Sequence, residues 1–255
     1  MIRIGKCLPA YFFNKLWGNR KEYGKIPNKK DPCWLEWQQM QTKFYMENQR
    51  KGVGSVVNDS GYAVMSEIDL HKKCVLEIGP GDMRHHKFWI DPPRQYLIAD
   101  IHDGMMHAAK SVLDKEGISY ESFLVKRNEK LTIEKHSVDV IVTFYSLEHL
   151  HPLDDYLANI KHCLKPNGIL IGAIPAEGGL LWALGRYFTS RRWLHRNTNI
   201  NYDKLICWEH PNFADYIIHR LDKTFERVFV KAWPFPFLPF LDNNLTFKFC
   251  YKNRV

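Results

Sequence analysis

The sequence lacks long apolar runs and repeated segments. Apolar stretches stay short, as at Ile169–Ile171 and Tyr11–Phe13, whereas a membrane-spanning helix needs about 20 consecutive apolar residues. A transmembrane helix is therefore not expected, and residues 1–30 lack the apolar core of a secretory signal. No internal repeat or low-complexity tract is visible. With 45% hydrophobic and 25% charged residues among 255, the composition is that of a globular protein, not of a disordered or fibrous chain.

Cysteine pairs at metal-binding spacing are also missing. The six cysteines are scattered, none forms a C-x-x-C motif, and none stands at metal-site spacing from a histidine. Six thiols in a chain of this length are ordinary for a cytosolic protein, so we expect reduced, mostly packed cysteines and no metal site. The predicted location is cytoplasmic, with peripheral association at the inner face of a membrane as an additional expectation.

Acidic residues are scarce near the N-terminus. Residues 1–30 hold eight Lys and Arg but one acidic residue, Glu22, which gives a local charge of +7 in a chain of net charge +8. Aromatic residues are interleaved with these bases. Such a segment suits an anionic membrane surface, a phosphorylated ligand or nucleic acid, and a solvated tail is the simpler alternative. We expect an anionic membrane surface as the partner. The oligomeric state is left open.

From Cys74 onward, apolar strand patterns alternate with helical ones. The expected strands are Cys74–Gly79, Gln95–Asp100, Tyr120–Val125, Ser137–Thr143, Gly168–Ile174, Arg227–Lys231 and Thr246–Tyr251, and the expected helices are Trp34–Lys51, Leu153–Leu164 and Asn212–Asp222. Gly52, Gly54 and Gly61 indicate a loop. Strands alternating with helices predict an α/β fold with a mainly parallel sheet.

The patterns divide the chain into two parts. Residues 1–70 are expected to form a basic N-terminal arm and a helical cap, and residues 71–255 the α/β domain. Within that domain, residues 176–208 are aromatic, basic and mostly helical in pattern. Because this insert follows the fifth strand, it is expected to overhang the ligand cleft as a lid.

A glycine turn follows the first strand. Gly79 and Gly81 stand where a strand passes into a helix, so backbone N–H groups can approach a ligand closely. Asp100 ends the next strand, 19 residues after Gly81, which suits hydrogen bonds to ribose hydroxyls. A dinucleotide fingerprint would have its third glycine at Arg84. The ligand expected from this pattern is therefore not a pyrophosphate.

With these motifs, the sequence resembles the class I S-adenosylmethionine-dependent methyltransferases. The first family motif is matched by Glu77, Gly79 and Gly81, with Met83 in place of the third glycine. The segments Ser137–Leu150 and Leu164–Leu170 are similar to the fourth strand with its loop and to the turn before the fifth strand. The resemblance implies a Rossmann-like, seven-stranded, mostly parallel sheet with helices on both faces and one antiparallel strand near its edge.

The resemblance also assigns the cofactor and site residues. It implies S-adenosylmethionine as cofactor, with Glu77, Gly79, Gly81, Asp100 and Tyr145 in contact with it. His149, after the fourth strand, and His210, before the last helix, are candidate bases for an oxygen acceptor, with capping or packing as the alternative role. The predicted substrate-binding residues are Glu148, Arg186, Arg191 and Arg192.

A divalent metal site and a nucleic-acid substrate are both disfavoured. Glu148, His149 and His210 echo a metal-binding pattern of some relatives, but Tyr145 replaces the first carboxylate of that pattern. Asp91–Pro93 resembles a signature of nucleobase methyltransferases, yet it lies before the second strand, whereas that signature belongs after the fourth.

The whole outline is similar to bacterial methyltransferases of surface polysaccharides. We therefore expect O-methylation of a sugar in a glycan, nucleotide-sugar or lipid-linked saccharide, with an anionic acceptor. The alternatives are a methyltransferase for a small acidic or lipid-soluble metabolite, and a non-catalytic S-adenosylmethionine-binding module recruited to a membrane or partner. RNA binding through residues 1–30 is a third possibility, which would show a steep salt dependence.

Overall fold

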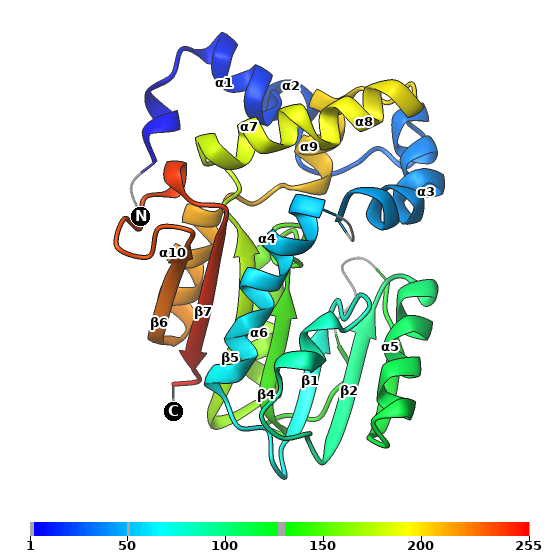
Figure 1. Cartoon of the computed structure of the whole chain (residues 1–255), viewed down its shortest axis with the longest axis vertical. Coiled ribbons are helices and arrows are strands. Elements are labelled where there is room, and N and C mark those ends of the chain that lie inside the picture. Colours follow the sequence, from blue (N-terminus) through cyan, green and yellow to red (C-terminus); the bar gives the residue numbers. More distant parts are fainter. Residues whose placement is uncertain (1–2, 50–51, 127–130, 255) are drawn as a thin grey trace.

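The computed structural model describes residues 3–49, 52–126 and 131–254. A seven-stranded sheet with strand order β3-β2-β1-β4-β5-β7-β6 forms its centre (Figure 1). The strands are β1 (Cys74–Ile78), β2 (Gln95–Asp100), β3 (Ser119–Leu124), β4 (Val138–Phe144), β5 (Leu164–Pro175), β6 (Glu226–Trp233) and β7 (Thr246–Lys252). β1 to β5 pair in parallel, and β7 is antiparallel to both of its neighbours. The predicted Rossmann-like fold, with its antiparallel final strand, is confirmed.

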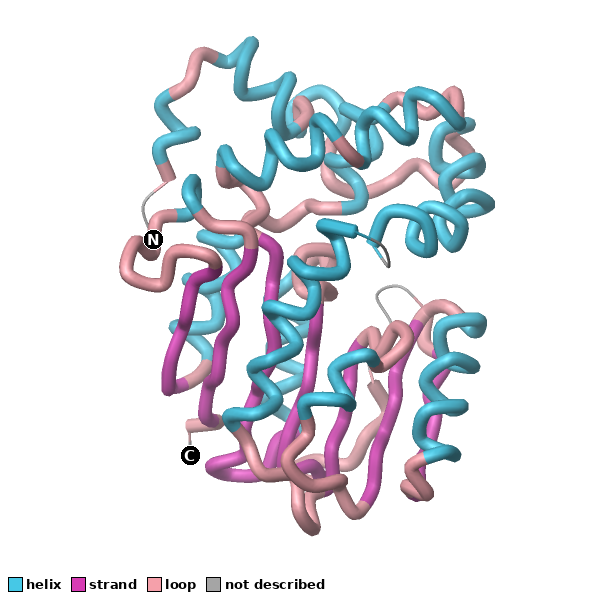
Figure 2. The backbone as a smooth tube through the Cα atoms, viewed as in Figure 1, coloured by secondary structure: helices cyan, strands magenta, loops and turns pink. Residues whose placement is uncertain are grey.

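Helices cover both faces of the sheet (Figure 2). The α-helices are α1 (Ala10–Trp17), α2 (Arg20–Tyr23), α3 (Pro32–Phe44), α4 (Gly52–Tyr62), α5 (Asp103–Lys115), α6 (Leu153–Cys163), α7 (Leu180–Phe188), α8 (Ser190–Asn197), α9 (Tyr202–Glu209) and α10 (Ala214–Thr224). Successive strand residues point to opposite faces, so Val75 packs toward the α4 and α5 side while Leu76 packs toward α6 and α10. Both faces of the central strands β1, β2 and β4 are therefore buried, which is why these strands are mostly apolar. The outer strands β3 and β6 are largely exposed.

A separate helical layer lies beyond the carboxyl ends of the parallel strands (Figure 1). It combines α1, α2 and α3 with α7, α8 and α9. Trp34 and Trp37 of α3 share a core with Leu194 of α8 and Ile206 of α9, and Trp17 of α1 is fully buried. The N-terminal segment is thus packed against the 176–208 insert in one layer, and it is not a solvated tail.

The prediction of a loop around Gly52 and Gly61 is wrong, because helix α4 spans these residues. A Cβ atom on Gly61 would collide with the Tyr145 hydroxyl and would lie 2.8 Å from the Ala173 Cβ. This glycine therefore serves the close approach of a helix to the sheet, which outweighs its low helix propensity. The expected helix 34–51 ends earlier, at Phe44, where a π-helical turn begins; residues 50 and 51 lie outside the described residues.

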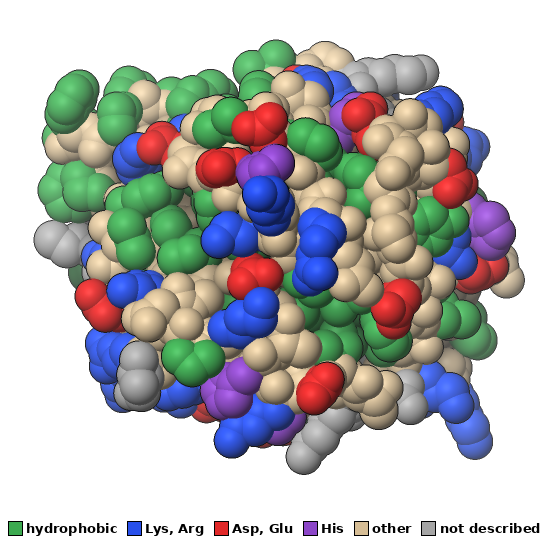
Figure 3. Space-filling model, turned by 90° about the horizontal axis from the view of Figure 1, so that it is seen from below, with side chains coloured by type: hydrophobic (Ala, Val, Ile, Leu, Met, Phe, Trp, Pro, Cys, Tyr) green, Lys and Arg blue, Asp and Glu red, His purple; other side chains and the backbone are tan. Residues whose placement is uncertain are grey.

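No helix within the described ranges is long and apolar enough to cross a membrane. Figure 3 shows the end of the molecule opposite the helical layer, where basic and acidic side chains are interspersed across the centre of the face. All six cysteines are unpaired thiols, and Cys74, Cys163, Cys207 and Cys250 are buried, as expected for reduced, packed cysteines.

Candidate active site

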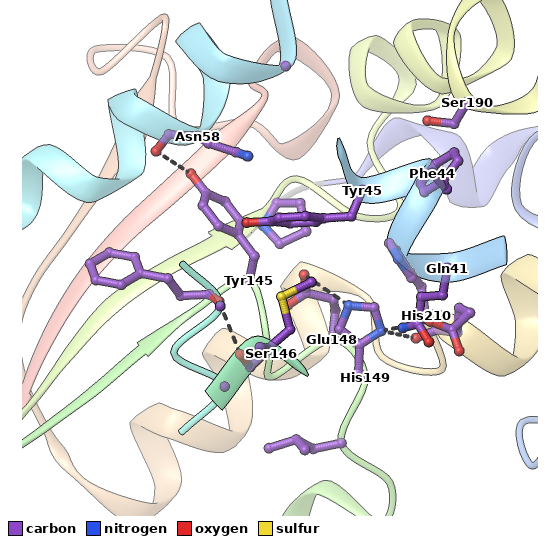
Figure 4. Close-up of a pocket in the computed structure, with 18 of the residues that line it drawn as sticks. Gln41, Phe44, Tyr45, Asn58, Tyr145, Ser146, Glu148, His149, Ser190 and His210 are labelled. Carbon is purple, nitrogen blue, oxygen red and sulfur yellow. Dashed lines mark hydrogen bonds and ion pairs between the residues drawn. The ribbon is translucent and has the colours of Figure 1, made fainter. Parts of the chain in front are cut away.

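A cavity of about 730 Å³ lies between the carboxyl ends of the strands and the helical layer. This volume is within the usual range for small-molecule sites. One half, here called the cofactor half, is lined by the turn after β1 and the residues after β2. The acceptor half is lined by the loop after β4, by α7 and by α9 with the following His210. Figure 4 shows the side chains around the junction of the two halves.

The glycine turn after β1 forms the floor of the cofactor half. Gly79 and Gly81 have φ angles of +70° and +55°, a region that disfavours residues with a Cβ atom. A Cβ on Gly79 would also collide with the Ser146 Oγ, whose hydroxyl donates to the carbonyls of Ile78 and Phe144. The turn therefore presents bare backbone to the cavity, as a nucleoside-binding turn requires.

Met83, at the third-glycine position, also adopts a left-handed conformation, with φ of +51°. The conformation costs a non-glycine residue about 1–2 kcal/mol. The side chain is fully buried among the residues on the α4 and α5 side of the sheet, and burying a methionine stabilises by about 1.5–3 kcal/mol. Packing thus offsets the backbone strain, and the turn keeps the glycine geometry.

Asp100 lines the cofactor half at the end of β2. Its Oδ1 accepts a 2.8 Å hydrogen bond from the backbone N–H of His102, and only 9% of the residue is exposed. Burial raises the pKa of this carboxyl, although the His102 N–H and imidazole act in the opposite direction. A carboxylate held in this way can accept hydrogen bonds from vicinal hydroxyls, as on a ribose.

Glu77 differs from its predicted role as a direct ligand. The fully buried side chain is not part of the cavity lining. Its Oε2 accepts a 2.9 Å hydrogen bond from the Tyr96 hydroxyl, and its Oε1 lies 2.8 Å from the His85 Nε2. Glu77 therefore holds the strand beneath the turn and does not face a ligand.

Tyr145 and Tyr45 close the cavity from above the strand ends (Figure 4). The Tyr145 hydroxyl donates to the carbonyls of Val57 and Asn58 at 3.2 and 3.0 Å, which ties the loop after β4 to α4. The Tyr45 hydroxyl donates to the Asp82 carboxylate at 3.2 Å, next to the glycine turn. Tyr145 lines the cavity, and its predicted contact with the cofactor stays a prediction.

The two candidate bases are brought together in the acceptor half. The rings of His149 and His210 meet edge-on, with centroids 4.6 Å apart. The His149 Nδ1 lies 2.5 Å from the Glu209 carbonyl oxygen, and the His210 Nδ1 lies 2.5 Å from the Glu177 Oε2. His149 comes from the loop after β4 and His210 from the end of α9, so the sheet and the helical layer each supply one imidazole.

Glu177, just after β5, connects the lid to this histidine pair. Its fully buried Oε2 is contacted at 2.7 Å by Arg186 and at 3.0 Å by the Trp182 indole N–H, both from α7, as well as by His210. Burial raises the pKa of Glu177, but Arg186 and His210 outweigh burial and hold the pKa at about 2. Glu177 is therefore ionised near neutral pH and orients both the Arg186 guanidinium and the His210 imidazole.

Glu148 is a second buried carboxyl near the histidine pair, and its pKa is shifted in the opposite direction to that of Glu177. It lines the acceptor half with 2% of its surface exposed, and its Oε1 lies 3.8 Å from the His149 Nε2. Burial raises its pKa to about 8, because hydrogen bonding to its own backbone N–H only partly offsets desolvation. Among the described residues, its Oε2 has no hydrogen-bond partner. Glu148 is thus a mostly protonated carboxyl at neutral pH, able to donate a hydrogen bond.

Of the three lid arginines predicted to bind substrate, only Arg186 faces the cavity. Arg186 lines it, but its Nη1 is paired with Glu177. Arg191 forms a two-armed ion pair with Asp203, at 2.8 and 3.2 Å, outside the cavity lining. Arg192 is exposed and is also outside the lining. The substrate-binding assignment of Arg191 and Arg192 is therefore corrected, because a nearby carboxylate or the solvent, not the cavity, takes up their charge.

Several lining residues were not singled out from the sequence. They include Tyr45, Ser146, Tyr202 and Glu209. Glu177, which is outside the lining but contacts Trp182 and His210 in it, comes two residues after the fifth strand, and acidic residues at carboxyl strand ends are a usable signal. Within the described ranges, no three His, Cys, Asp or Glu side chains are arranged to hold a metal ion.

The comparisons with known proteins agree with this fold. Residues 76–172 match the family of proteins described as "Methyltransferase domain". No curated protein matches the chain.

Solved structures share the fold at low sequence identity. An S-adenosylmethionine-dependent methyltransferase from Mesorhizobium loti is 14% identical over 78% of this chain and 96% of its own, with a TM-score of 0.51. The N-methyltransferase NodS from Bradyrhizobium japonicum, in complex with S-adenosyl-L-homocysteine, is 15% identical over 88% and 89%, with a TM-score of 0.50. The CurJ carbon methyltransferase is 16% identical over 96% and 67%, with a TM-score of 0.57.

Proposed function

We propose that this chain, which is an S-adenosylmethionine-dependent methyltransferase with its methyltransferase domain at residues 76–172, methylates a hydroxyl of a saccharide joined to a larger apolar group, such as a lipid-linked saccharide. The cofactor supplies an activated methyl group on a sulfonium sulfur. The protein must align the acceptor, exclude water and take up the hydroxyl proton. The paired imidazoles of His149 and His210 carry this proposal, because an oxygen acceptor needs such a base.

The residues of the cofactor half fit S-adenosylmethionine. Gly79 and Gly81 present backbone without side chains to the cavity, and a Cβ on Gly79 would collide with Ser146. Asp100 lines the same half and places a carboxylate for the ribose hydroxyls. Arg84, at the third-glycine position of the dinucleotide fingerprint, donates to the Ser55 hydroxyl and does not line the cavity. These residues suit one nucleoside.

The hydrogen bonds of the two imidazoles support the Nε2 atom as the base in each ring. The Glu209 carbonyl can only accept, so the His149 Nδ1 carries the hydrogen. The ionised Glu177 likewise accepts from the His210 Nδ1. In each neutral ring the lone pair is then on Nε2, which can take the proton of an attacking hydroxyl.

The lining of the cavity supports the saccharide-bearing acceptor. Six aromatic residues of the lining come from α3 with its π-helical turn and from the lid: Trp37, Phe44, Tyr45, Trp182, Phe188 and Tyr202. Such rings can cover a sugar face or an apolar chain. Arg186 and the protonated Glu148 add polar groups for hydroxyls or an acidic substituent. Because most of the wall is apolar, a small hydroxyl-bearing lipophilic metabolite is the second candidate.

A transfer assay with labelled cofactor separates the candidates. The acceptor panel contains a free saccharide, a nucleotide-sugar, a lipid-linked saccharide and a lipophilic alcohol. We expect label in the lipid-linked saccharide, in an ether that resists mild base. Label in the lipophilic alcohol alone would favour the second candidate. Binding of S-adenosylhomocysteine without transfer to any hydroxyl would reject O-methylation and favour a non-catalytic module.

Single substitutions then test the histidine pair and the cofactor half. His149→Ala and His210→Ala should each lower kcat, by about 10²–10⁴-fold for the general base, with unchanged affinity for S-adenosylhomocysteine. His107→Ala, at an exposed position on α5, is the matched control. Asp100→Ala should instead weaken binding of S-adenosylhomocysteine. Wild-type turnover in both active-site histidine variants would assign these residues to packing.

A further inference from the structure

A second cavity, of about 300 Å³, lies outside the active site between the N-terminal helices and the start of α10. Its lining includes Arg3, Arg20, Lys25, Phe213, Asp215 and Tyr216. We propose that this cavity, here called the arm cavity, binds a phosphoryl anion. The proposal is independent of the methyl acceptor.

Two guanidinium groups are fixed in the arm cavity by one aromatic ring. The Cζ atoms of Arg3 and Arg20 lie 4.3 and 4.1 Å from the ring centroid of Phe213, within the range of cation–π attraction. Arg20 also donates to the carbonyl of Trp17 and, at 2.7 Å, to that of His210. The two cations are therefore held in place before any ligand arrives.

The positive charge of the arm cavity is not balanced within it. Three cationic residues line it against one carboxylate, Asp215, whose Oδ1 lies 3.6 Å from the Arg3 Nη1. The Arg3 side chain is 4% exposed, and its Nε has no hydrogen-bond partner in the part of the chain that the structure describes. Asp242 and Glu177 also act on Arg3 electrostatically, but neither lines the cavity.

Burial lowers the pKa of Arg3 and Arg20, and partial desolvation at the rim lowers that of Lys25, which agrees with this imbalance. For Arg3 the attraction of Asp215 only partly opposes burial. For Lys25 burial and the neighbouring Arg20 both lower the pKa. Buried charges without a counter-charge are costly, so a bound anion would relieve a cost that the protein otherwise carries.

A phosphoryl group is the anion that best matches these donors. Planar guanidinium groups bind phosphate oxygens in paired hydrogen bonds. Lys25 is exposed, its Nζ lies 5.8 Å from the Tyr216 ring, and it adds a mobile charge at the rim. The phosphoryl group can belong to a free phosphate or to a lipid headgroup. Tyr11 and Phe12, 70% and 55% exposed on α1, would favour the lipid source.

The test is titration of the full chain with inorganic phosphate. S-adenosylhomocysteine is kept saturating, so that the cofactor half is filled, and chloride at equal ionic strength is the blank. We expect phosphate to raise the melting temperature in a saturable way. Lys25→Gln should weaken phosphate binding by about 5–10-fold, the effect of one charge-assisted hydrogen bond. Lys29→Gln removes the same charge from an exposed position on the arm outside the cavity and should leave binding unchanged.

Arg3→Gln provides a second variant, with its fold checked by circular dichroism and by cofactor affinity. It should weaken phosphate binding more than Lys25→Gln does. Sedimentation with phosphatidate vesicles, against phosphatidylcholine vesicles, identifies the source. Vesicle binding that depends on Lys25, without binding of free phosphate, assigns the site to a lipid headgroup; the reverse assigns it to a soluble phosphate. Equal binding by the Lys25 and Lys29 variants in both assays, or no binding in either, would overturn the proposal.

Discussion

Replacing Glu148 with glutamine should stabilise the protein, and the gain should grow with pH. The side chain is 2% exposed, and burial raises its pKa from 4.5 to about 8. A carboxyl with a higher pKa in the folded state binds its proton more tightly when folded. The folded state therefore loses stability as the pH rises from about 4.5 to about 8, and it loses no more above that range. A neutral glutamine of similar shape removes this loss.

The size of the stability cost follows from the pKa shift of Glu148. Each pKa unit corresponds to about 1.4 kcal/mol, so the wild type carries a cost of about 3 kcal/mol at pH 7 and about 5 kcal/mol above pH 8. These values are upper bounds, because local opening lets water reach the ionised carboxylate. The difference between Glu148→Gln and the wild type should be near zero at about pH 4. Glu177 titrates at low pH in both proteins, so its contribution cancels in that difference.

Urea unfolding of both proteins across about pH 4 to 9, at constant ionic strength, measures this difference directly. Glu116→Gln, at an exposed position after α5, is the control and should show no pH-dependent gain. Methyl transfer should fall in the Glu148 variant, since a buried carboxyl at the acceptor half is retained at the expense of stability. A gain that is flat with pH, or a loss of stability at pH 7, would refute the reasoning.

Two further predictions concern stability and packing. Glu177→Gln leaves the buried guanidinium of Arg186 without its counter-charge, so the free energy of unfolding measured in urea should fall by about 3–5 kcal/mol. In the wild type, the folded pKa of Glu177 is about 2, so stability should fall as the pH drops from about 4.5 toward 2. A loss below about 1 kcal/mol would mean that Arg186 finds another partner. Gly61→Ala forces a methyl group onto the Tyr145 hydroxyl and should lower stability by about 1–3 kcal/mol. Gly104→Ala on α5, where a Cβ meets open space, should be neutral or stabilising, and equal effects of the two substitutions would contradict the packing argument.

Local patterns were sufficient to predict the strands of the sheet. The strand expected at Gln95–Asp100 has those bounds in the structure. For the other strands, apart from the start of β5, each end lies within two residues of the expected one. Strand β5 differs most, because it begins at Leu164 rather than Gly168. Apolar period and turn residues are properties of neighbouring positions, which is why they can be read directly. The glycine turn and the acid at the end of β2 follow from the same local rules.

Helix α4 and the partners of the lid arginines could not be derived in this way. Gly52–Tyr62 is a helix although its glycines favour a loop, because a close contact with the sheet, through Gly61, requires one of them. Which partner neutralises each arginine also depended on distance in space, not in sequence. Arg186 pairs with Glu177 at the cavity wall, whereas Arg191 pairs with Asp203 outside the cavity lining and is unavailable to an acceptor.

The sequence by itself determined the α/β fold, the position of the cofactor turn and the candidate histidines, because each depends on residues close together along the chain. Only the tertiary structure decided that α3 and the 176–208 insert share one core, and that His149 and His210 face each other. It also separated Glu148 from Glu177: burial alone protonates the first, whereas burial beside Arg186 keeps the second ionised. The surroundings of a side chain, not its type, set its charge.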